Sequence, residues 1–195
     1  MDYRLQVIIG CVLGDGRLDR PGPGNSRLLV RHSIKQLDYA IYKYNVLKPY
    51  SLKLFEVSWI DKRTKRLYSA VGFNTRRDEL FTRLYKLFHP GGRKIVPDNI
   101  DEIANEVALA IFVGDDGTWD PSAKTVKISV DSYDYRSRVN IVKWLRSLEI
   151  EATIEKDRVY ILRRSTPYLV ELVRKHLPPT MHYKLGLSTR HNTVF

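Results

Sequence analysis

The chain has very little cysteine and no long apolar run. Cys11 is the single cysteine among 195 residues, so neither an internal disulfide nor a cysteine-based zinc site can form. No apolar run approaches the roughly 18 residues that a membrane-spanning helix needs. The short apolar stretch 7–13 runs into Asp15 and Gly16 without a small-residue cleavage site, which argues against a signal peptide. These absences predict an intracellular protein with no membrane partner.

Two further patterns are missing. The sequence has no GxxxxGK[ST] phosphate-binding loop, so nucleotide hydrolysis is not predicted. Its 5 histidines show no metal-ligand spacing, and a zinc site is therefore not expected.

Positive charge is in excess. Lysine and arginine number 33 against 22 aspartates and glutamates, for a net charge of +11. Such an excess favours polyanionic partners, because binding releases condensed counterions, but it does not distinguish DNA from RNA. Hydrophobic residues make up 43% of the chain, enough for a packed core. Basic residues interrupt apolar segments such as 27–31, which indicates folded basic surfaces rather than a charged tail.

The order of predicted elements occurs twice. Residues 2–14 form an apolar helix that ends at Gly14, and residues 101–114 form another that begins at Asp101 as N-cap and ends at Gly114. Each is followed by a strand, a helix, a hairpin and an amphipathic helix. In the first half these are 27–33, 37–47, 53–60 with 67–73, and 77–88; in the second they are 125–131, 135–148, 151–155 with 158–162, and 167–176.

Glycine and proline at 89–93 mark the join between the repeats. We therefore expect an N-terminal half at 1–92, a linker at 93–100 and a C-terminal half at 101–195.

Acidic residues stand at matching ends of the two apolar helices. Gly10 with Gly14, and Ala110 with Gly114, place small residues four apart on each helix, a spacing that lets two backbones approach closely. Such packing would bring Asp15 and Asp116 side by side, where their repulsion favours a bound cation. Oxygen ligands select Mg²⁺, which can activate water and stabilise a leaving oxygen. Either acid alone reads more simply as a turn residue; the matched pair favours the metal site.

The segments IIGCVLGDG (8–16) and LAIFVGDDG (109–117) resemble the two motifs of single-chain LAGLIDADG homing endonucleases. The resemblance implies a mixed α+β fold of two pseudo-twofold αββαββα halves, with saddle-shaped antiparallel sheets and the motif helices packed at the interface. Leu13 and Gly114 stand where the motif has its first Asp, and Ile111 where it has Gly. These departures affect helix packing rather than chemistry.

The resemblance also implies a site-specific double-strand DNA endonuclease that makes a staggered, metal-assisted cut with 3′ overhangs, and a monomer. The last acid of each motif binds metal in the family, which corresponds to Asp15 and Asp116; Asp115 is the competing acid, and Gly14 stands at its place in the first motif. Basic segments that end each half suggest Lys94 and Lys184 as catalytic lysines. Mg²⁺ is the expected cofactor, and Mn²⁺ or Ca²⁺ could take the same site.

Basic and polar residues on the strand faces and loops are the candidate DNA contacts. They are Arg27, Arg31, Lys62, Arg63, Lys65, Arg66, Lys127, Ser129, Arg158, Arg163 and Arg164.

A second class of function stays open at this point. It is a non-catalytic nucleic-acid binder on the same fold, either an intron RNA maturase or a DNA-binding regulator. Aromatic residues suited to stacking on RNA bases are present, but Tyr39, Tyr42, Tyr85 and Trp144 fall on the apolar faces of predicted helices, where packing is the expected role.

Overall fold

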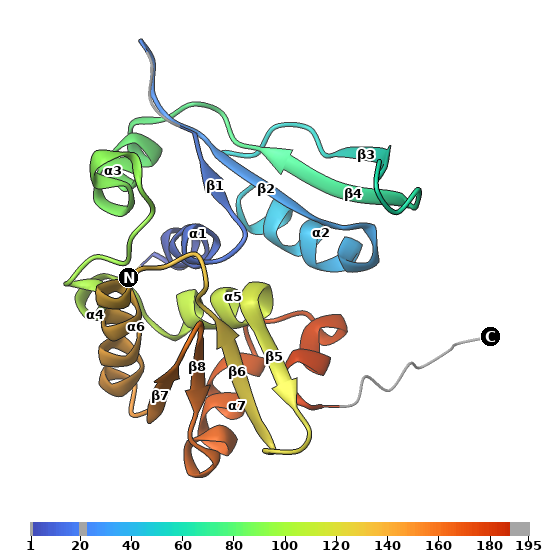
Figure 1. Ribbon diagram of the computed structural model, residues 1–195. Coiled ribbons are helices and arrows are strands. Elements are labelled where there is room, and N and C mark those ends of the chain that lie inside the picture. Colours follow the sequence, from blue (N-terminus) through green and yellow to red (C-terminus); the bar gives the residue numbers. More distant parts are fainter. Residues whose placement is uncertain (1, 20–22, 188–195) are drawn as a thin grey trace.

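Two four-stranded antiparallel sheets dominate the computed structural model, which describes residues 2–19 and 23–187 (Figure 1). In both sheets the strand that directly follows a motif helix lies at one edge, and the remaining strands have the same order. The first sheet runs β1 (Arg17–Leu18), β2 (Leu28–Ser33), β4 (Leu67–Asn74), β3 (Phe55–Ile60), and the second β5 (Gly117–Asp120), β6 (Thr125–Ser129), β8 (Arg158–Ile161), β7 (Ala152–Glu155).

Helices α1 (Tyr3–Leu13) and α5 (Glu106–Asp116) lie side by side between the two sheets (Figure 1). The other helices are divided between the halves: α2 (Leu37–Val46) and α3 (Glu79–Phe88) in the first, and α4 (Ile100–Ile103), α6 (Tyr135–Ser147) and α7 (Thr166–Arg174) in the second. Short 3-10 segments are η1 (Ile34–Gln36), η2 (Pro90–Gly92), η3 (Arg163–Ser165) and η4 (Pro179–Leu185). The predicted mixed fold with two repeated halves is confirmed.

Local sequence explains most of these elements. Asp2 caps α1 by accepting from the Arg4 amide at 3.0 Å, and Asp78 caps α3 by accepting from the Leu80 amide at 3.0 Å. Alternation shapes the strands: Leu28 and Val30 of β2 are buried, whereas the neighbouring residues face the open side. The same alternation holds in β6, as its sequence predicted.

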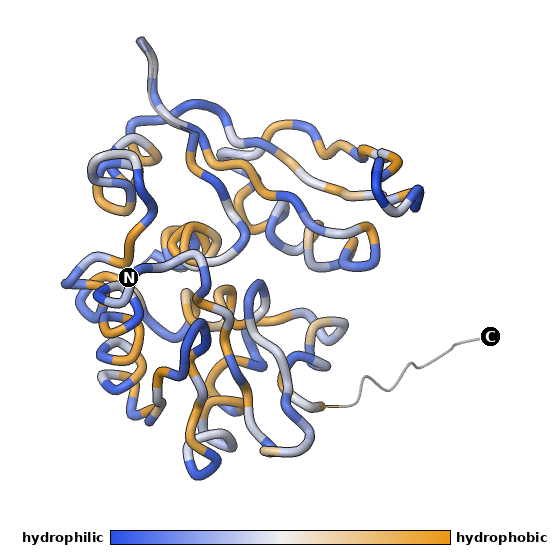
Figure 2. The backbone as a smooth tube through the Cα atoms, viewed as in Figure 1, coloured by the Kyte–Doolittle hydropathy of each residue, from blue (hydrophilic) through white to orange (hydrophobic). Residues whose placement is uncertain are grey.

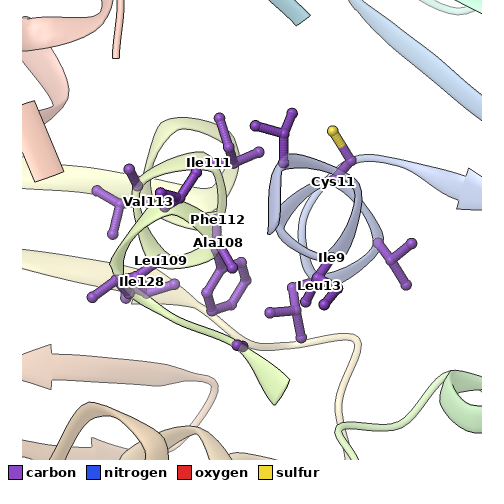
Figure 3. Close-up of a cluster of buried hydrophobic side chains, with 14 of the residues drawn as sticks. Ile9, Cys11, Leu13, Ala108, Leu109, Ile111, Phe112, Val113 and Ile128 are labelled. Carbon is purple, nitrogen blue, oxygen red and sulfur yellow. The ribbon is translucent and has the colours of Figure 1, made fainter. Parts of the chain in front are cut away.

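The hydrophobic core is continuous through both halves, because α1 and α5 are apolar on nearly every side and are buried along most of their length (Figure 2). Figure 3 shows the side chains of Ile9, Cys11 and Leu13 gathered around α1 next to those of α5, among them Ile111 and Phe112. A helix that is hydrophobic all round needs partners on all sides. Each central helix finds them in the other and in its own sheet.

The start of the second motif helix differs from the prediction. Asp101 does not cap it. The helix is interrupted at Ala104, and Asn105 caps α5 by accepting from the Val107 amide at 3.0 Å. Contacts from distant residues satisfy the backbone at this break. Gln6 Nε2 donates to the Ile103 carbonyl at 2.9 Å, and Trp144 Nε1 donates to the Ala104 carbonyl at 2.9 Å.

The end of this helix was also predicted wrongly. Gly14 does terminate α1, but α5 continues through Gly114 to Asp116 and ends at Gly117. Asp15 therefore lies just beyond its helix, whereas Asp116 is the last residue of its own.

The glycines at the contact between the two helices belong to α1. A Cβ at Gly10 would lie 2.5 Å from Ile111 Cβ, and a Cβ at Gly14 would clash with Asp115. Gly114 instead faces Tyr39 of α2, because the α5 residues that meet the α1 glycines are Ile111 and Asp115. The prediction of close packing is confirmed for α1, and the prediction that Gly114 contributes to it is wrong.

The residues of the edge strands β1 and β5 were not predicted, because each strand is short and directly follows a motif.

No described helix is long and apolar enough to cross a membrane.

Candidate metal centre and nucleic-acid interface

The adjacent ends of α1 and α5 bring Asp15 and Asp116 into one electrostatic environment. The Asp15 side chain is 47% exposed, so its carboxylate is open to a ligand. Burial and the neighbouring Asp115 carboxylate raise the pKa of Asp15. Burial, followed by the charges of Asp15 and Asp115, raises the pKa of Asp116 to about 7. The three acids therefore repel one another, which is the condition in which a bound cation is favourable.

Two lysines reach the main chain at these helix ends. Lys94 Nζ donates to the Leu13 carbonyl at 3.1 Å and to the Gly14 carbonyl at 2.9 Å. Lys184 Nζ donates to the Asp115 carbonyl at 3.2 Å. The two lysines therefore serve matching positions, because Gly14 and Asp115 each precede the last acid of a motif. Burial lowers the pKa of Lys94.

Asp115 is in a different environment from Asp116. Its side chain is fully buried and forms an ion pair with the equally buried Lys43 of α2, with Nζ 2.6 Å from Oδ1. Its other oxygen, Oδ2, accepts from the Asp15 amide at 3.1 Å. The Asp115 carboxylate is thus engaged inside the protein, whereas its main-chain carbonyl points to Lys184.

His32 of β2 completes this buried cluster. Its Nε2 lies 3.1 Å from Lys43 Nζ, and its Nδ1 lies 3.8 Å from Asp15 Oδ2. Burial, followed by the Lys43 charge, lowers the pKa of His32 to about 4, so its ring is neutral near pH 7. Asp15, His32 and Asp115 each place one ligand atom within 4.8 Å of the others, a spacing compatible with a metal ion. The Lys43 ammonium already bonds two of these three groups.

The atoms around the helix ends fit a hard divalent cation. Carboxylate oxygens of Asp15 and Asp116 and main-chain oxygens of Gly14 and Asp115 are the ligand types that Mg²⁺, Mn²⁺ and Ca²⁺ prefer. The raised pKa of Asp116 shows that negative charge there lacks full compensation within the protein.

The open face of the first sheet begins directly beside Asp15. Arg17 of β1, Arg31 of β2 and Phe55 of β3 line a pocket of about 220 Å³ together with Asp15. Arg31 is exposed, and its guanidinium lies 5.9 Å from the centre of the Phe55 ring. Arg17 was not among the predicted contacts, although its place two residues after Asp15 would have indicated it.

The hairpin between β3 and β4 carries the densest positive charge of this sheet. Figure 2 shows its turn as strongly hydrophilic. Close to this turn Trp59 and Tyr68 pair across the strands, stack with ring centres 6.0 Å apart, and are 45% and 43% exposed. The predicted cations Lys62, Arg63, Lys65 and Arg66 are all exposed.

The other predicted contacts are spread over several surfaces. Lys127, Ser129 and Arg158 share the open face of the second sheet, where Ser129 is paired with Arg158. Arg27, Lys127 and Arg164 are held by acids: Arg27 Nε lies 3.1 Å from Asp19, Lys127 Nζ lies 3.2 Å from Asp120, and Arg164 Nε lies 2.8 Å from Glu151. Arg163 is exposed in η3, beside Trp119 and α7, away from that open face.

The aromatic residues expected in the core are largely found there. Tyr39 and Trp144 are fully buried, and Tyr42 and Tyr85 pack partly buried against the core.

A sequence profile of the LAGLIDADG DNA endonuclease family matches residues 5–168. The chain belongs to this family. The match covers both motif helices and both sheets, so the two segments 8–16 and 109–117 are LAGLIDADG motifs of one chain, as their resemblance indicated.

Known proteins similar to this chain have different named activities. Cytochrome b mRNA maturase bI2 of Debaryomyces hansenii is 24% identical over 93% of this chain and 73% of its own length. Intron-encoded endonuclease ai4 of Dictyostelium discoideum is 24% identical over 74% of this chain and 91% of its own length. The homing endonuclease I-WcaI, solved bound to its DNA recognition sequence, has the same fold, with a TM-score of 0.83, 19% identity, and coverage of 94% of this chain and 85% of that one.

Proposed function

We propose that this LAGLIDADG protein is a site-specific endonuclease that hydrolyses both strands of a DNA target with the help of Mg²⁺. The observation that carries the proposal is the duplicated helix end. Asp15 and Asp116 each follow a main-chain carbonyl that accepts a hydrogen bond from a lysine, Lys94 or Lys184. A protein that only binds nucleic acid has no use for carboxylates facing phosphates.

The carboxylates of Asp15 and Asp116 would hold the cation, together with the main-chain oxygens of Gly14 and Asp115. When bound, the cation would lower the pKa of a water molecule and offset charge on the phosphate. Asp116 is preferred over Asp115 as the carboxylate ligand, because the Asp115 side chain is buried and paired with Lys43.

Lys94 and Lys184 would act beside each acid. Their Nζ atoms lie near the helix ends, where an ammonium group can orient the attacking water or stabilise negative charge that develops on the phosphate.

The DNA would lie across the open faces of both sheets. We centre this surface on Arg17, Arg31, Lys127, Ser129 and Arg158, with the hairpin between β3 and β4 reaching phosphates. Arg27, Arg163 and Arg164 remain candidates at its margins, and Arg163 lies beside α7. A chain with both motifs would work as an intracellular monomer, divided into the halves 1–92 and 101–195 by the linker 93–100.

A second candidate function is binding of intron RNA without DNA cleavage. It is favoured by the similarity to the yeast maturase and by the exposed, stacked Trp59 and Tyr68, which are suited to unpaired bases. A DNA-binding regulator would bind DNA with the same sheets, and its acids would have no catalytic role.

The test has two stages. Double-stranded DNA that binds the protein is first selected from a genomic fragment library in Ca²⁺, and Mg²⁺ is then added to the purified complexes. We expect both strands to be cut at a defined position, with no cutting in EDTA. Bound DNA that is neither cut nor nicked would refute the endonuclease and leave the regulator; selective binding of intron RNA, with no selected DNA, would support the maturase.

A further inference from the structure

A charged cluster is buried beneath one of the two acids. Lys43 and Asp115 have fully buried side chains and form an ion pair of 2.6 Å between halves, since Lys43 belongs to α2 and Asp115 to α5. Lys43 also contacts His32, whose ring lies 3.8 Å from the Asp15 carboxylate. The buried cluster therefore lies directly beside Asp15.

Asp15 depends on this cluster for its main-chain hydrogen bond. Beyond α1, the amides of Gly14 and Gly16 donate to carbonyls of the same helix, those of Gly10 and Cys11. The Asp15 amide instead donates to Asp115 Oδ2 at 3.1 Å. Lys43 fixes the Asp115 carboxylate, and that carboxylate fixes the backbone of Asp15.

The second half has no counterpart of the cluster. Arg17 pairs with Leu29 in the first sheet and Thr118 with Lys127 in the second, so Leu29 corresponds to Lys127 and His32 to Val130. By the same count, from the matching starts of α2 and α6, Lys43 corresponds to Ile141.

The corresponding positions around Asp116 are apolar or lack a side chain. Val130 and Ile141 are fully buried, and Gly14 stands in the place of Asp115. Asp116 needs no such support, because it is still part of α5.

Burying two charges is expensive, and an apolar pair of similar volume is often equally stable or more stable. The second half shows that the fold can be built without charged residues at these positions. A role in stability alone therefore does not account for Lys43 and Asp115.

We propose that each acid serves the cleavage of one DNA strand and that Lys43 is a positioning residue for Asp15, acting through the Asp115 carboxylate, so that the two strands are cut at different rates. The proposal rests on the endonuclease function. On the Asp15 side of the centre a buried ion pair holds the acid in place, and the Asp116 side lacks such a pair. The ratio of the two strand-cleavage rates therefore depends on Lys43 and Asp115.

Two double variants separate positioning from charge. Lys43→Met alone leaves a buried unpaired carboxylate and is expected to fold poorly. In Lys43→Met/Asp115→Asn the charges are gone, but an amide oxygen can still accept from the Asp15 amide. In Lys43→Met/Asp115→Leu the charges are gone and so is the acceptor, in a side chain with the same number and branching of heavy atoms.

Strand-specific cleavage is measured on a target labelled on each strand in turn, and nicked intermediates are followed on a plasmid. We expect the Leu double variant to slow one strand at least about tenfold more than the other and to accumulate nicked plasmid, with a much smaller change of ratio in the Asn double variant. Phe88→Leu, at a buried core residue that ends α3, serves as a control for reduced stability and should slow both strands equally. Equal slowing of both strands in the Leu variant would overturn the proposal.

A second readout needs neither metal nor DNA. Hydrogen exchange of the Asp15 amide, resolved by NMR, should be at least about tenfold faster in the Leu double variant than in the Asn double variant, relative to the Gly14 amide of each. Equal exchange would refute the positioning role. If the wild type binds DNA but does not cut it, the endonuclease function fails and the strand-rate claim fails with it, while the exchange experiment still decides whether Asp115 positions Asp15.

Discussion

At the scale of single residues, environment separates acids that the sequence places next to each other. Asp115 and Asp116 are adjacent, yet the first is sealed in an ion pair and the second meets the charge of Asp15 across the helix interface. Consecutive side chains of an α-helix point about 100° apart, so Asp115 is directed toward α2 and Asp116 toward the candidate metal centre.

The first prediction concerns the two acids of the centre. Asp15→Asn and Asp116→Asn should each keep DNA affinity and lose cleavage by about 10²-fold or more, because each removes a charged oxygen from the cation. Binding is measured by fluorescence anisotropy in Ca²⁺ and cleavage on the selected target in Mg²⁺. Glu171→Gln, on the exposed surface of α7, is the control. Cleavage at the wild-type rate by either Asp variant would show that the acid is wrongly assigned.

The second prediction concerns pH. Burial and neighbouring acids raise the pKa of Asp116 to about 7, so folding favours its protonated form. Its contribution to stability is full at pH below about 4, the range of an unfolded aspartate, and is lost as the pH rises to about 7. Asp15 shifts in the same direction.

A bound cation would relieve this repulsion only when the carboxylates are charged. Mg²⁺ should therefore raise the melting temperature of the DNA-free protein more at pH 8 than at pH 5.5, as followed by circular dichroism. Asp116→Asn should reduce the difference between the two pH values. An equal rise at both pH values in the wild type would contradict the assignment.

At the scale of elements, the contact between α1 and α5 decides the geometry of the centre. A Cβ at Gly10 would lie 2.5 Å from Ile111 Cβ and 2.6 Å from the Ala108 carbonyl, so the helices could not keep their present separation. Cross-half hydrogen bonds add to this contact: Gln6 bonds the break before α5, and the Tyr133 hydroxyl donates to the Leu13 carbonyl at 2.6 Å.

The third prediction follows from that contact. Gly10→Ala should lower the free energy of unfolding by roughly 1–3 kcal/mol, because overpacking outweighs the gain in helix propensity of about 0.5–1 kcal/mol. Denaturant unfolding measures the change. Gly24→Ala is the matched control, since a Cβ there has nothing within 4 Å, and it should be neutral or slightly stabilising. A Gly10→Ala protein as stable as the wild type would show that α1 and α5 can separate without cost.

At the scale of the whole molecule, a net charge of +11 is arranged around two sheets whose open faces carry basic residues. The turn between β3 and β4 contributes four exposed cations to this arrangement. Charges at such a distance from the acids should affect DNA affinity rather than the chemistry of cleavage.

The fourth prediction tests this separation. Replacing Lys62, Arg63, Lys65 and Arg66 by Gln should weaken DNA binding and lower the slope of log K against log salt by about 0.9 for each phosphate that the hairpin no longer neutralises, with cleavage of bound DNA unchanged. Titrations at several salt concentrations measure the slope. Arg174→Gln with Lys175→Gln, at exposed positions where α7 ends, should leave this slope unaltered. An unchanged slope in the hairpin variant would place the hairpin away from the DNA.

Repetition in the sequence was sufficient to predict the larger features. Two apolar helices, alternating strands and paired acids recur in the same order, and the periods of 3.6 and 2 that mark helix and strand are local properties of the chain. The repeated order of elements and the acids at matching helix ends could therefore be expected from residues alone, whereas the two antiparallel sheets and the packed helix pair were implied by the family resemblance. The DNA contacts and the metal remain predictions.

Features that depend on partners distant in sequence were decided by tertiary structure. The break before α5 rests on Gln6 and Trp144, and the burial of Asp115 rests on Lys43, which is 72 positions away in the sequence. No local pattern distinguishes Lys43 from the lysines on the surface. The sequence by itself determined which elements form and that they form twice; only packing determined that one acid of the second motif would be buried and the other left at the centre, because the environment of a charge is set by what surrounds it in space.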